Sequence, residues 1–162
     1  TFVTQKIALA VANIKLKKQD CLYLGNLNSK RDWGHAIDFV EGMWKILQHE
    51  NADDFVLATG RTETIRYFVE QAFKEVSVNI NWEGEGLNEI GRDIANGNII
   101  VKIDPNYFRP TEVELLVGDY NKAKKHLQWE PSKSLENIIE EMVRIALHNA
   151  KQPKSNYLLA DF

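Results

Sequence analysis

Two short apolar runs constrain the fold of this chain more than any other feature of its sequence. CLYLG, residues 21–25, and FVLATG, residues 55–60, are continuous and end in glycine. Such runs are typical of strands that are buried on both faces of a parallel sheet. Patterns of helical period flank them over residues 4–18, over residues 33–49, and after Thr62, which we expect to cap the third helix. Alternating helices and buried strands predict an α/β fold.

These two strands are too few to form a doubly wound sheet by themselves. We therefore expect them to pair with strands that this sequence does not contain. The chain of 162 residues has no internal repeat, low-complexity tract or shift in composition, so we expect a single region spanning residues 1–162. It opens in mid-pattern on TFVTQKIALA, a start that fits the back part of a longer protein.

The helix predicted over residues 33–49 has the strongest apolar pattern. Asp32 precedes it as a predicted N-cap. Two apolar stripes run side by side along it, one formed by Ile37, Val40, Trp44 and Leu47, the other by Ala36, Phe39, Met43 and Ile46. We therefore expect this helix to be buried over a wide face.

The second half of the chain gives weaker signals. Alternating apolar residues predict strands around residues 78–82 and 99–103, and the glycine-containing stretch between them is predicted to be a loop with one helical turn. Asp119 is expected to cap a short helix that ends near Leu127, and the last helix is expected from Ser134 to about Asn149. The tail after it has no usable period.

Composition and charge argue against several classes of partner. The net charge of -3 gives no overall attraction to nucleic acid or to an anionic membrane, so any anion must be recognised locally. The longest early apolar run, IALAVA, is too short to span a membrane. The single cysteine, Cys21, cannot form an internal disulfide, which fits a cytoplasmic protein. The four histidines lack the spacing of metal ligands, so we predict no metal site.

Two short motifs suggest catalytic or cofactor chemistry but lack the required context. Gly84 and Gly86 match the first two glycines of the dinucleotide-binding pattern Gly-x-Gly-x-x-Gly. The sixth position of that pattern is Glu89 and not glycine, and no long helix follows directly. Tyr120 and Lys124 have the spacing of a proton-transfer pair, but they lie on a predicted surface helix rich in lysine. We therefore predict that this chain carries no catalytic residue and no cofactor-binding residue.

Basic residues in loops and near helix starts are the remaining candidates for a site. Lys6, Arg31, Arg92 and Arg109 occupy such positions. Guanidinium groups there suit bidentate capture of a diphosphate, which the N–H groups of a helix N-terminus would reinforce. The same arginines would also suit surface ion pairs with Asp32, Glu89 or Glu112, and the pattern alone leaves both interpretations open.

A family resemblance favours the first interpretation. The segments YLGNLNSKRDWGHAIDFVEGMW, DFVLATG, INWEG, EIGRD, IDPNYFRPTEVELLVGD and NKAKKHLQWEP follow one another in this order. Together they resemble the C-terminal part of the GDP-mannose 4,6-dehydratases, which are extended short-chain dehydrogenase/reductases. The resemblance covers about residues 1–148, and it implies an α/β substrate-binding part that lacks most of the Rossmann sheet but includes a strand and a helix that return to it.

The resemblance also implies a reaction for the parent enzyme. Members convert GDP-mannose to GDP-4-dehydro-6-deoxy-mannose and water, towards GDP-fucose and other deoxyhexoses. NADP, held by an N-terminal domain that this chain lacks, takes a hydride from C4 and returns it to C6. This chain would bind GDP-mannose and would be inactive alone, and the parent would be a homo-oligomer, a dimer or a tetramer.

The site residues are transferred from the family position by position. Val3 and Lys6 match the segment close to the substrate, and Arg31 and Arg109 match arginines that approach the diphosphate. Glu112 matches the acceptor of the ribose hydroxyls, and Arg92 matches an arginine on the nucleotide side. Asn26 and Tyr107 are weaker candidates. Gln5 stands where the family commonly has arginine, which removes one positive contact near the start.

Two alternatives remain at this stage. The first is a related nucleotide-sugar epimerase or reductase, because similar arginine motifs occur across the extended members. The second is a non-catalytic module that binds a nucleotide sugar or mediates oligomerisation. A glycine-rich loop and a Tyr-x-x-x-Lys pair upstream of Thr1 would support the dehydratase.

Overall fold

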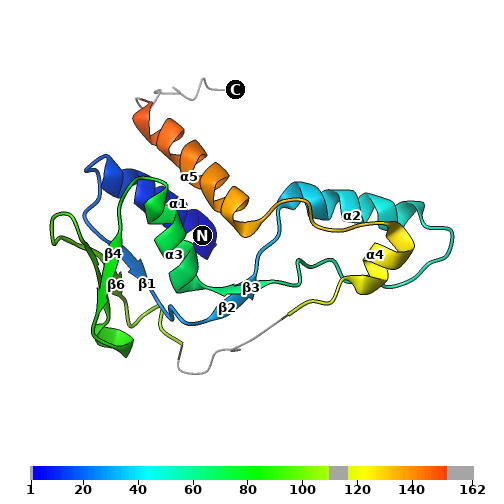
Figure 1. Cartoon of the computed structure of the whole chain (residues 1–162), viewed down its shortest axis with the longest axis horizontal. Coiled ribbons are helices and arrows are strands. Elements are labelled where there is room, and N and C mark those ends of the chain that lie inside the picture. The colour runs from blue at the N-terminus through cyan, green and yellow to red at the C-terminus, as the bar shows by residue number, and fades with distance from the viewer. Residues whose placement is uncertain (1, 110–116, 153–162) are drawn as a thin grey trace, which may run out of the picture.

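The structure is a computed structural model, and it describes residues 2–109 and 117–152. Five α-helices, one short 3-10 helix and six strands occur in these residues. In chain order they are α1 (Val3–Lys15), β1 (Leu22–Leu24), β2 (Lys30–Asp32), α2 (Ala36–Gln48), β3 (Thr62–Thr64), α3 (Ile65–Lys74), β4 (Ile80–Glu83), η1 (Gly86–Asn88), β5 (Ile90–Asp93), β6 (Ile99–Ile103), α4 (Asn121–Leu127) and α5 (Leu135–Lys151). The larger lobe contains the sheet with α1, α3 and α5, and the smaller lobe contains α2 and α4 (Figure 1).

The larger lobe is built on a four-stranded sheet of order β1-β6-β5-β4. β1 and β6 are parallel, with Leu22 opposite Val101, whereas β5 is antiparallel to both of its neighbours. The expectation that CLYLG lacks a partner in this sequence is therefore wrong, because the segment 99–103 pairs with it. The predicted loop between β4 and β6 contains the expected helical turn, η1, and also a strand, β5, that was not predicted.

Three helices form the core of this lobe. α1 packs against both α3 and α5, and the fully buried side chains include Ile7, Phe68, Phe73 and Ile139. The predicted first and last helices are confirmed to within a few residues. Ser134 caps α5 through a capping box with Asn137, as its position at the predicted start required. Among the described residues, no helix is both long and apolar enough to cross a membrane.

A two-stranded ribbon joins the lobes, and it changes two predicted caps. β2 and β3 are antiparallel, with Arg31 opposite Glu63. Asp32 lies in β2 and does not cap α2, because its carboxylate instead accepts hydrogen bonds from the amides of Thr59 and Gly60. His35 caps α2. Thr62 lies in β3, and Thr64 caps α3 in its place.

The segment FVLATG does not form the predicted strand within this chain. Residues 55–60 run through the smaller lobe without strand pairing. Phe55 and Leu57 pack beside a small core of Ala123, Leu127 and Trp129, together with Phe39, Ile46 and Tyr120. Gly42 permits this packing, since a Cβ there would lie 2.7 Å from the Leu57 side chain.

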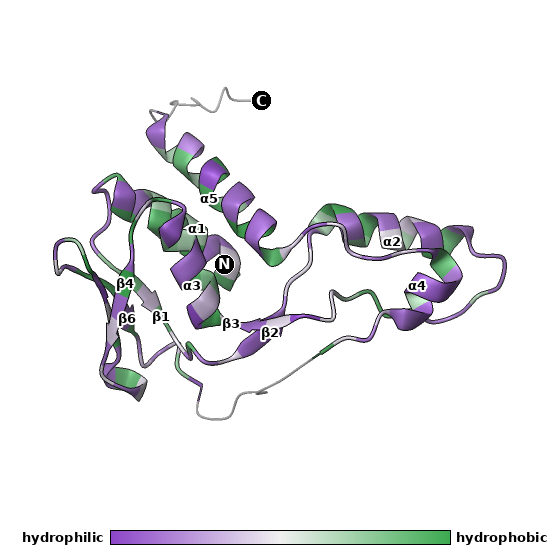
Figure 2. Ribbon diagram, in the orientation of Figure 1, coloured by the Kyte–Doolittle hydropathy of each residue, from purple (hydrophilic) through white to green (hydrophobic). Residues whose placement is uncertain are grey.

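Helix α2 exposes the apolar stripe that was expected to be buried. Val40 is 63% exposed, Trp44 60% and Leu47 80%, and Ile37 and Met43 are similarly open. Figure 2 shows hydrophobic residues alternating with hydrophilic ones along α2. Within the described residues, only Asp38 and Gly42 of this helix are buried. The prediction that α2 is buried over a wide face is therefore wrong for this chain alone.

Candidate functional site

The carboxyl ends of β1 and β6 bring together two loops that are distant in the sequence. Because these strands are parallel, the loops that follow them leave from the same edge of the sheet. The Asp104 amide donates to the Leu24 carbonyl over 2.8 Å, which extends the pairing beyond the strands. In α/β sheets, ligands bind in the crevice outside these carboxyl ends. A ligand-binding site is therefore expected at this edge.

Asn26 ties the two loops together and holds the backbone of Arg109. Its side-chain nitrogen donates to the Arg109 carbonyl, and its side-chain oxygen accepts from the Arg109 amide, both over 2.8 Å. The preceding Gly25 lies so close to the other loop that a Cβ would stand 2.1 Å from the Tyr107 carbonyl oxygen. Asn26 thus has the structural hydrogen-bonding role that the sequence left open beside a ligand-binding one.

Lys6 and Tyr107 form a second contact at the same edge. The Lys6 Nζ lies 3.5 Å from the centre of the Tyr107 ring, a cation–π geometry. Burial lowers the pKa of Lys6, although Asp104 opposes that effect. Together with Asn13, Tyr23 and other residues, these three side chains line an open pocket of about 570 Å³. An ammonium group held at the wall of a pocket suits an anionic or aromatic ligand.

Arg31 lies on the ribbon, five residues beyond Asn26. Its Nη1 donates to the Lys30 carbonyl over 2.7 Å, and its opposite residue in the ribbon is Glu63. The next residue but one, Trp33, packs edge-on against the buried ring of Phe68 at 5.2 Å between centroids. Trp33 therefore anchors the end of the strand that carries Arg31.

Arg92 lies away from this group. It is on β5, with Nε 2.9 Å from the Glu83 carboxylate and Nη1 3.1 Å from the Gly97 carbonyl. The structure does not bring it to the carboxyl ends of β1 and β6. Glu89, considered as a partner for the candidate arginines, instead binds Arg66. A ligand-binding role for Arg92 stays a prediction that would require its ion pair to open.

Two further predicted residues add little to the observed site. Val3 is the first residue of α1 and packs against the larger core, so its contact with a ligand stays a prediction. Glu112 lies outside the described residues. Within the described ranges, no group of three or more His, Cys, Asp or Glu side chains is placed to hold a metal ion.

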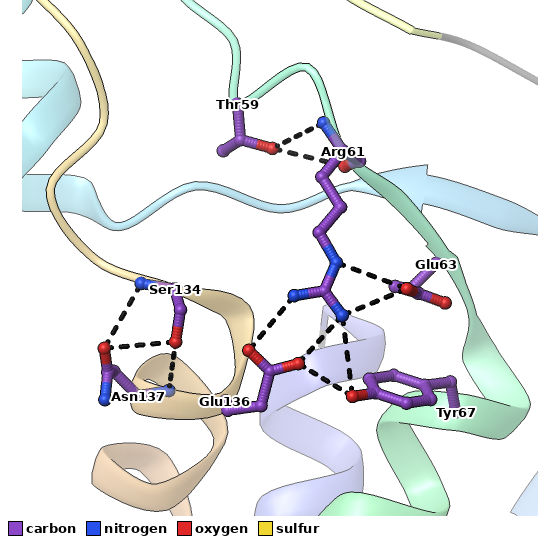
Figure 3. A network of polar contacts seen from close by, with 7 residues as sticks. All are labelled: Thr59, Arg61, Glu63, Tyr67, Ser134, Glu136 and Asn137. Atoms are coloured by element: carbon purple, nitrogen blue, oxygen red, sulfur yellow. Dashed lines mark hydrogen bonds and ion pairs between the residues drawn. The ribbon is translucent and has the colours of Figure 1, made fainter.

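Sequence reasoning missed a network centred on Arg61. Its guanidinium contacts the carboxylates of Glu63 and Glu136 and lies 3.5 Å from the Tyr67 hydroxyl (Figure 3). Tyr67 donates to Glu136 over 2.7 Å. Hydrogen bonds from Arg61 and Tyr67 lower the pKa of Glu136 to about 2, and the same contact with Glu136 raises the pKa of Tyr67. The network joins the ribbon to α3 and α5.

Comparison with known proteins places these features in a family context. The sequence profile of the family described as GDP-mannose 4,6 dehydratase matches residues 1–142. A GDP-mannose 4,6 dehydratase from Dictyostelium discoideum is 53% identical over 143 residues, which are 88% of this chain and 40% of the relative. A GDP-mannose 4,6 dehydratase from Homo sapiens is 48% identical over 142 residues, covering 88% of this chain and 38% of the relative.

A solved structure supports the fold. RMD from Pseudomonas aeruginosa, complexed with NADPH, is similar with a TM-score of 0.72 over 91% of this chain and 43% of that protein. The identity is 16%, so the likeness concerns the fold alone. The chain thus spans about 40% of the length of the curated relatives that it matches.

Proposed function

Because the chain belongs to the GDP-mannose 4,6-dehydratase family, we propose that it is the GDP-sugar-binding part of an enzyme of that activity. The whole enzyme would convert GDP-mannose to GDP-4-dehydro-6-deoxy-mannose and water, with no net oxidation or reduction. This product would lead towards GDP-fucose and other deoxyhexoses. The cytoplasmic location stays a prediction from the single cysteine, and the dimeric or tetrameric assembly stays a prediction from the resemblance.

The observation that carries the proposal is the convergence at the carboxyl ends of β1 and β6. Lys6 and Tyr107 meet there in one contact, and Asn26 holds the Arg109 backbone in another. We propose that Lys6, Arg31 and Arg109 attract the diphosphate, whose two charges favour several fixed donors. The inferred partner of the ribose hydroxyls is Glu112, with Val3 and Arg92 as weaker contacts on the nucleotide side.

Binding the part of the substrate that does not react serves the chemistry indirectly. Contacts to GDP fix one end of the molecule, so the sugar is presented in a limited set of positions. The residues proposed here would therefore orient the sugar and lower its KM, and the bond-making and bond-breaking groups would come from elsewhere in the enzyme.

NADP would bind outside this chain. The fit to a dinucleotide site fails at Gly84 and Gly86, which lead into the single 3-10 turn η1 and then into β5, not into a long helix. No other Gly-x-Gly sequence occurs in the 162 residues. We propose that hydride chemistry is supplied by an N-terminal NADP-binding domain.

The same domain would cover the exposed stripe of α2. Val40, Trp44 and Leu47 would be costly to leave in water as one contiguous apolar face. Val56, in the unpaired apolar segment 55–60, is also 54% exposed. Since about three-fifths of each relative's length lies outside the match, a Rossmann sheet accepting this segment as a strand is the occupant that we propose.

The test is product analysis of the full-length protein with GDP-mannose. We expect GDP-4-dehydro-6-deoxy-mannose to form without net consumption of NADPH. A reductase would consume NADPH in proportion to product, an epimerase would yield an isomeric GDP-hexose, and a non-catalytic module would yield nothing, so each of these results would contradict the proposal. The 162-residue chain alone should show no turnover.

A further inference from the structure

The ribbon formed by β2 and β3 depends on side chains for its position. It contains three residue pairs and belongs to a sheet of only two strands. Isolated two-stranded ribbons are marginally stable in water, so contacts with other elements must fix their place. Backbone hydrogen bonds from Ile65 to Ser29 and from Arg66 to Leu27 hold the end nearer the larger lobe. The end near Asp32 and Thr62 requires other anchors.

Arg61 provides such an anchor to α5. Its Nη1 lies 3.1 Å from one Glu136 oxygen and its Nη2 2.8 Å from the other, which is a bidentate pair. Glu136 is in the first turn of α5, where the helix dipole also favours a carboxylate. Tyr67 of α3 donates to the same carboxylate. One guanidinium therefore connects the ribbon to two core helices, as Figure 3 shows.

Arg61 also contacts the carboxylate that faces Arg31. Directly opposed residues of an antiparallel pair have side chains on the same face of the ribbon, so Glu63 and Arg31 are neighbours. The Nε and Nη2 atoms of Arg61 lie 3.2 and 3.0 Å from the Glu63 Oε1. An uncompensated Glu63 would repel a phosphate that approaches Arg31. Arg61 shares its one positive charge between Glu63 and Glu136, so it offsets part of this repulsion.

We propose that Arg61 is a positioning residue for the diphosphate: it fixes the ribbon against α5 and α3, and it offsets part of the charge of Glu63 beside Arg31. This inference rests on the proposed function, in which Arg31 contacts the diphosphate. Arg61 itself does not need to touch the ligand. It acts on substrate binding, because the chemistry takes place at the other end of the nucleotide sugar.

The test measures the affinity of the full-length protein for GDP by calorimetry, and KM and kcat with GDP-mannose. Arg61→Gln removes the charge and the anchor, and Glu136→Gln removes the anchor from the α5 side. Lys122→Gln is the matched control, since Lys122 is 45% exposed like Arg61 and pairs with Asp53 in the smaller lobe. A thermal unfolding curve of each variant verifies that it is folded.

We expect Arg61→Gln to weaken GDP binding roughly five- to tenfold and to raise KM equally, with kcat little changed. Glu136→Gln should show a smaller loss of the same kind, and Lys122→Gln none. Wild-type affinity in Arg61→Gln, or an equal loss in Lys122→Gln, would overturn this inference alone. Absence of GDP binding by the wild-type protein would overturn the proposed function, and this inference with it.

Discussion

Replacement of Gly25 by alanine should separate the two loops of the candidate site. The added Cβ would lie 2.1 Å from the carbonyl oxygen and 2.7 Å from the carbonyl carbon of Tyr107. Ordinary contacts of a Cβ begin near 3.4 Å, so the loop must retreat by more than 1 Å. Both neighbours are backbone atoms, which cannot rotate away as the end of a side chain can.

The cost follows from the contacts that this retreat disturbs. The two hydrogen bonds between Asn26 and Arg109 are each 2.8 Å, and such a movement would take them beyond hydrogen-bonding distance. Their loss costs about 1 kcal/mol each, and forcing a methyl group into a closed space costs about 1–3 kcal/mol. We therefore expect a destabilisation of roughly 3–5 kcal/mol, or a fall in Tm of about 6–20 °C at roughly 2–4 °C per kcal/mol.

The assay combines thermal unfolding with GDP titration of the full-length protein. Displacement of Arg109 and Tyr107 should weaken GDP binding by at least about tenfold, a loss near 1.4 kcal/mol. Gly86→Ala is the control: its Cβ would meet nothing within 4 Å, but its φ of +58 strains alanine. That variant should lose about 1 kcal/mol of stability and none of its GDP affinity. Wild-type Tm and affinity in Gly25→Ala would refute the reasoning.

Three further predictions follow from other contacts. Asp38→Asn should lower the free energy of unfolding by about 2–4 kcal/mol at neutral pH, because the buried carboxylate accepts from the Ser132 hydroxyl and from the Ser132 and Lys133 amides. Burial acts to raise the pKa of Asp38, but these hydrogen bonds outweigh it and lower the pKa. The stabilisation should therefore be present above pH ~4 and disappear as pH falls through the folded-state pKa, and acid titration of the wild type against the variant measures this. Lys6→Gln should weaken GDP binding. In the wild type, GDP affinity should fall at alkaline pH as Lys6 loses its charge, and because burial lowers the pKa of Lys6 this fall should begin below the usual lysine pKa of about 10.4. The variant should lack this fall, and identical pH profiles for the two proteins would contradict a phosphate-binding role. Trp44→Glu should cost the full-length protein roughly 3 kcal/mol and the 162-residue chain almost nothing, and equal Tm shifts in the two would argue against a cover over α2.

Local signals predicted the elements whose cause is local. Ser134 caps α5 through its own neighbour Asn137, and the alternation of Ile99, Val101 and Ile103 reflects the side-chain period of any strand. Asp32 failed as a predicted cap for a tertiary reason. Its carboxylate is occupied by Thr59 and Gly60, which approach from another part of the chain. His35 then takes the cap position.

The unpredicted strand β5 has an instructive cause. Glycine inside IGRD favours a loop when only the sequence is considered. Gly91 is required here because a Cβ would lie 2.9 Å from Ile80 and 3.0 Å from Trp82, side chains of the neighbouring strand. The residue that suggested a loop is therefore the one that leaves room for the side chains of Ile80 and Trp82 beside β5.

The ligand-binding roles of the candidate residues stay predictions, and the contacts that some of them make were not foreseen from the sequence. Motif resemblance selected Lys6, Arg31 and Arg109 as individual positions. The contacts of Lys6 with Tyr107 and of Asn26 with Arg109 depend on the parallel pairing of β1 with β6, a register that no local pattern encodes. The Arg61 network was not predicted for the same reason, because the main partner of Arg61, Glu136, is 75 residues away in the sequence. Contacts of this range become visible only when the helices and strands are assembled.

The two wrong predictions about burial have a common physical explanation. The stripe of α2 and the segment 55–60 are apolar enough to predict burial. A hydrophobic pattern indicates that a surface is buried, but it does not identify the element or domain that buries it. In this chain Trp44 and Val56 remain exposed, although Phe39 and Leu57, on the same two segments, pack into the smaller core. Both segments are thus already held in place by one face while the other stays open. A helix and an extended segment that are fixed in this way present a preformed surface, so a covering domain would gain apolar contact without having to order either of them.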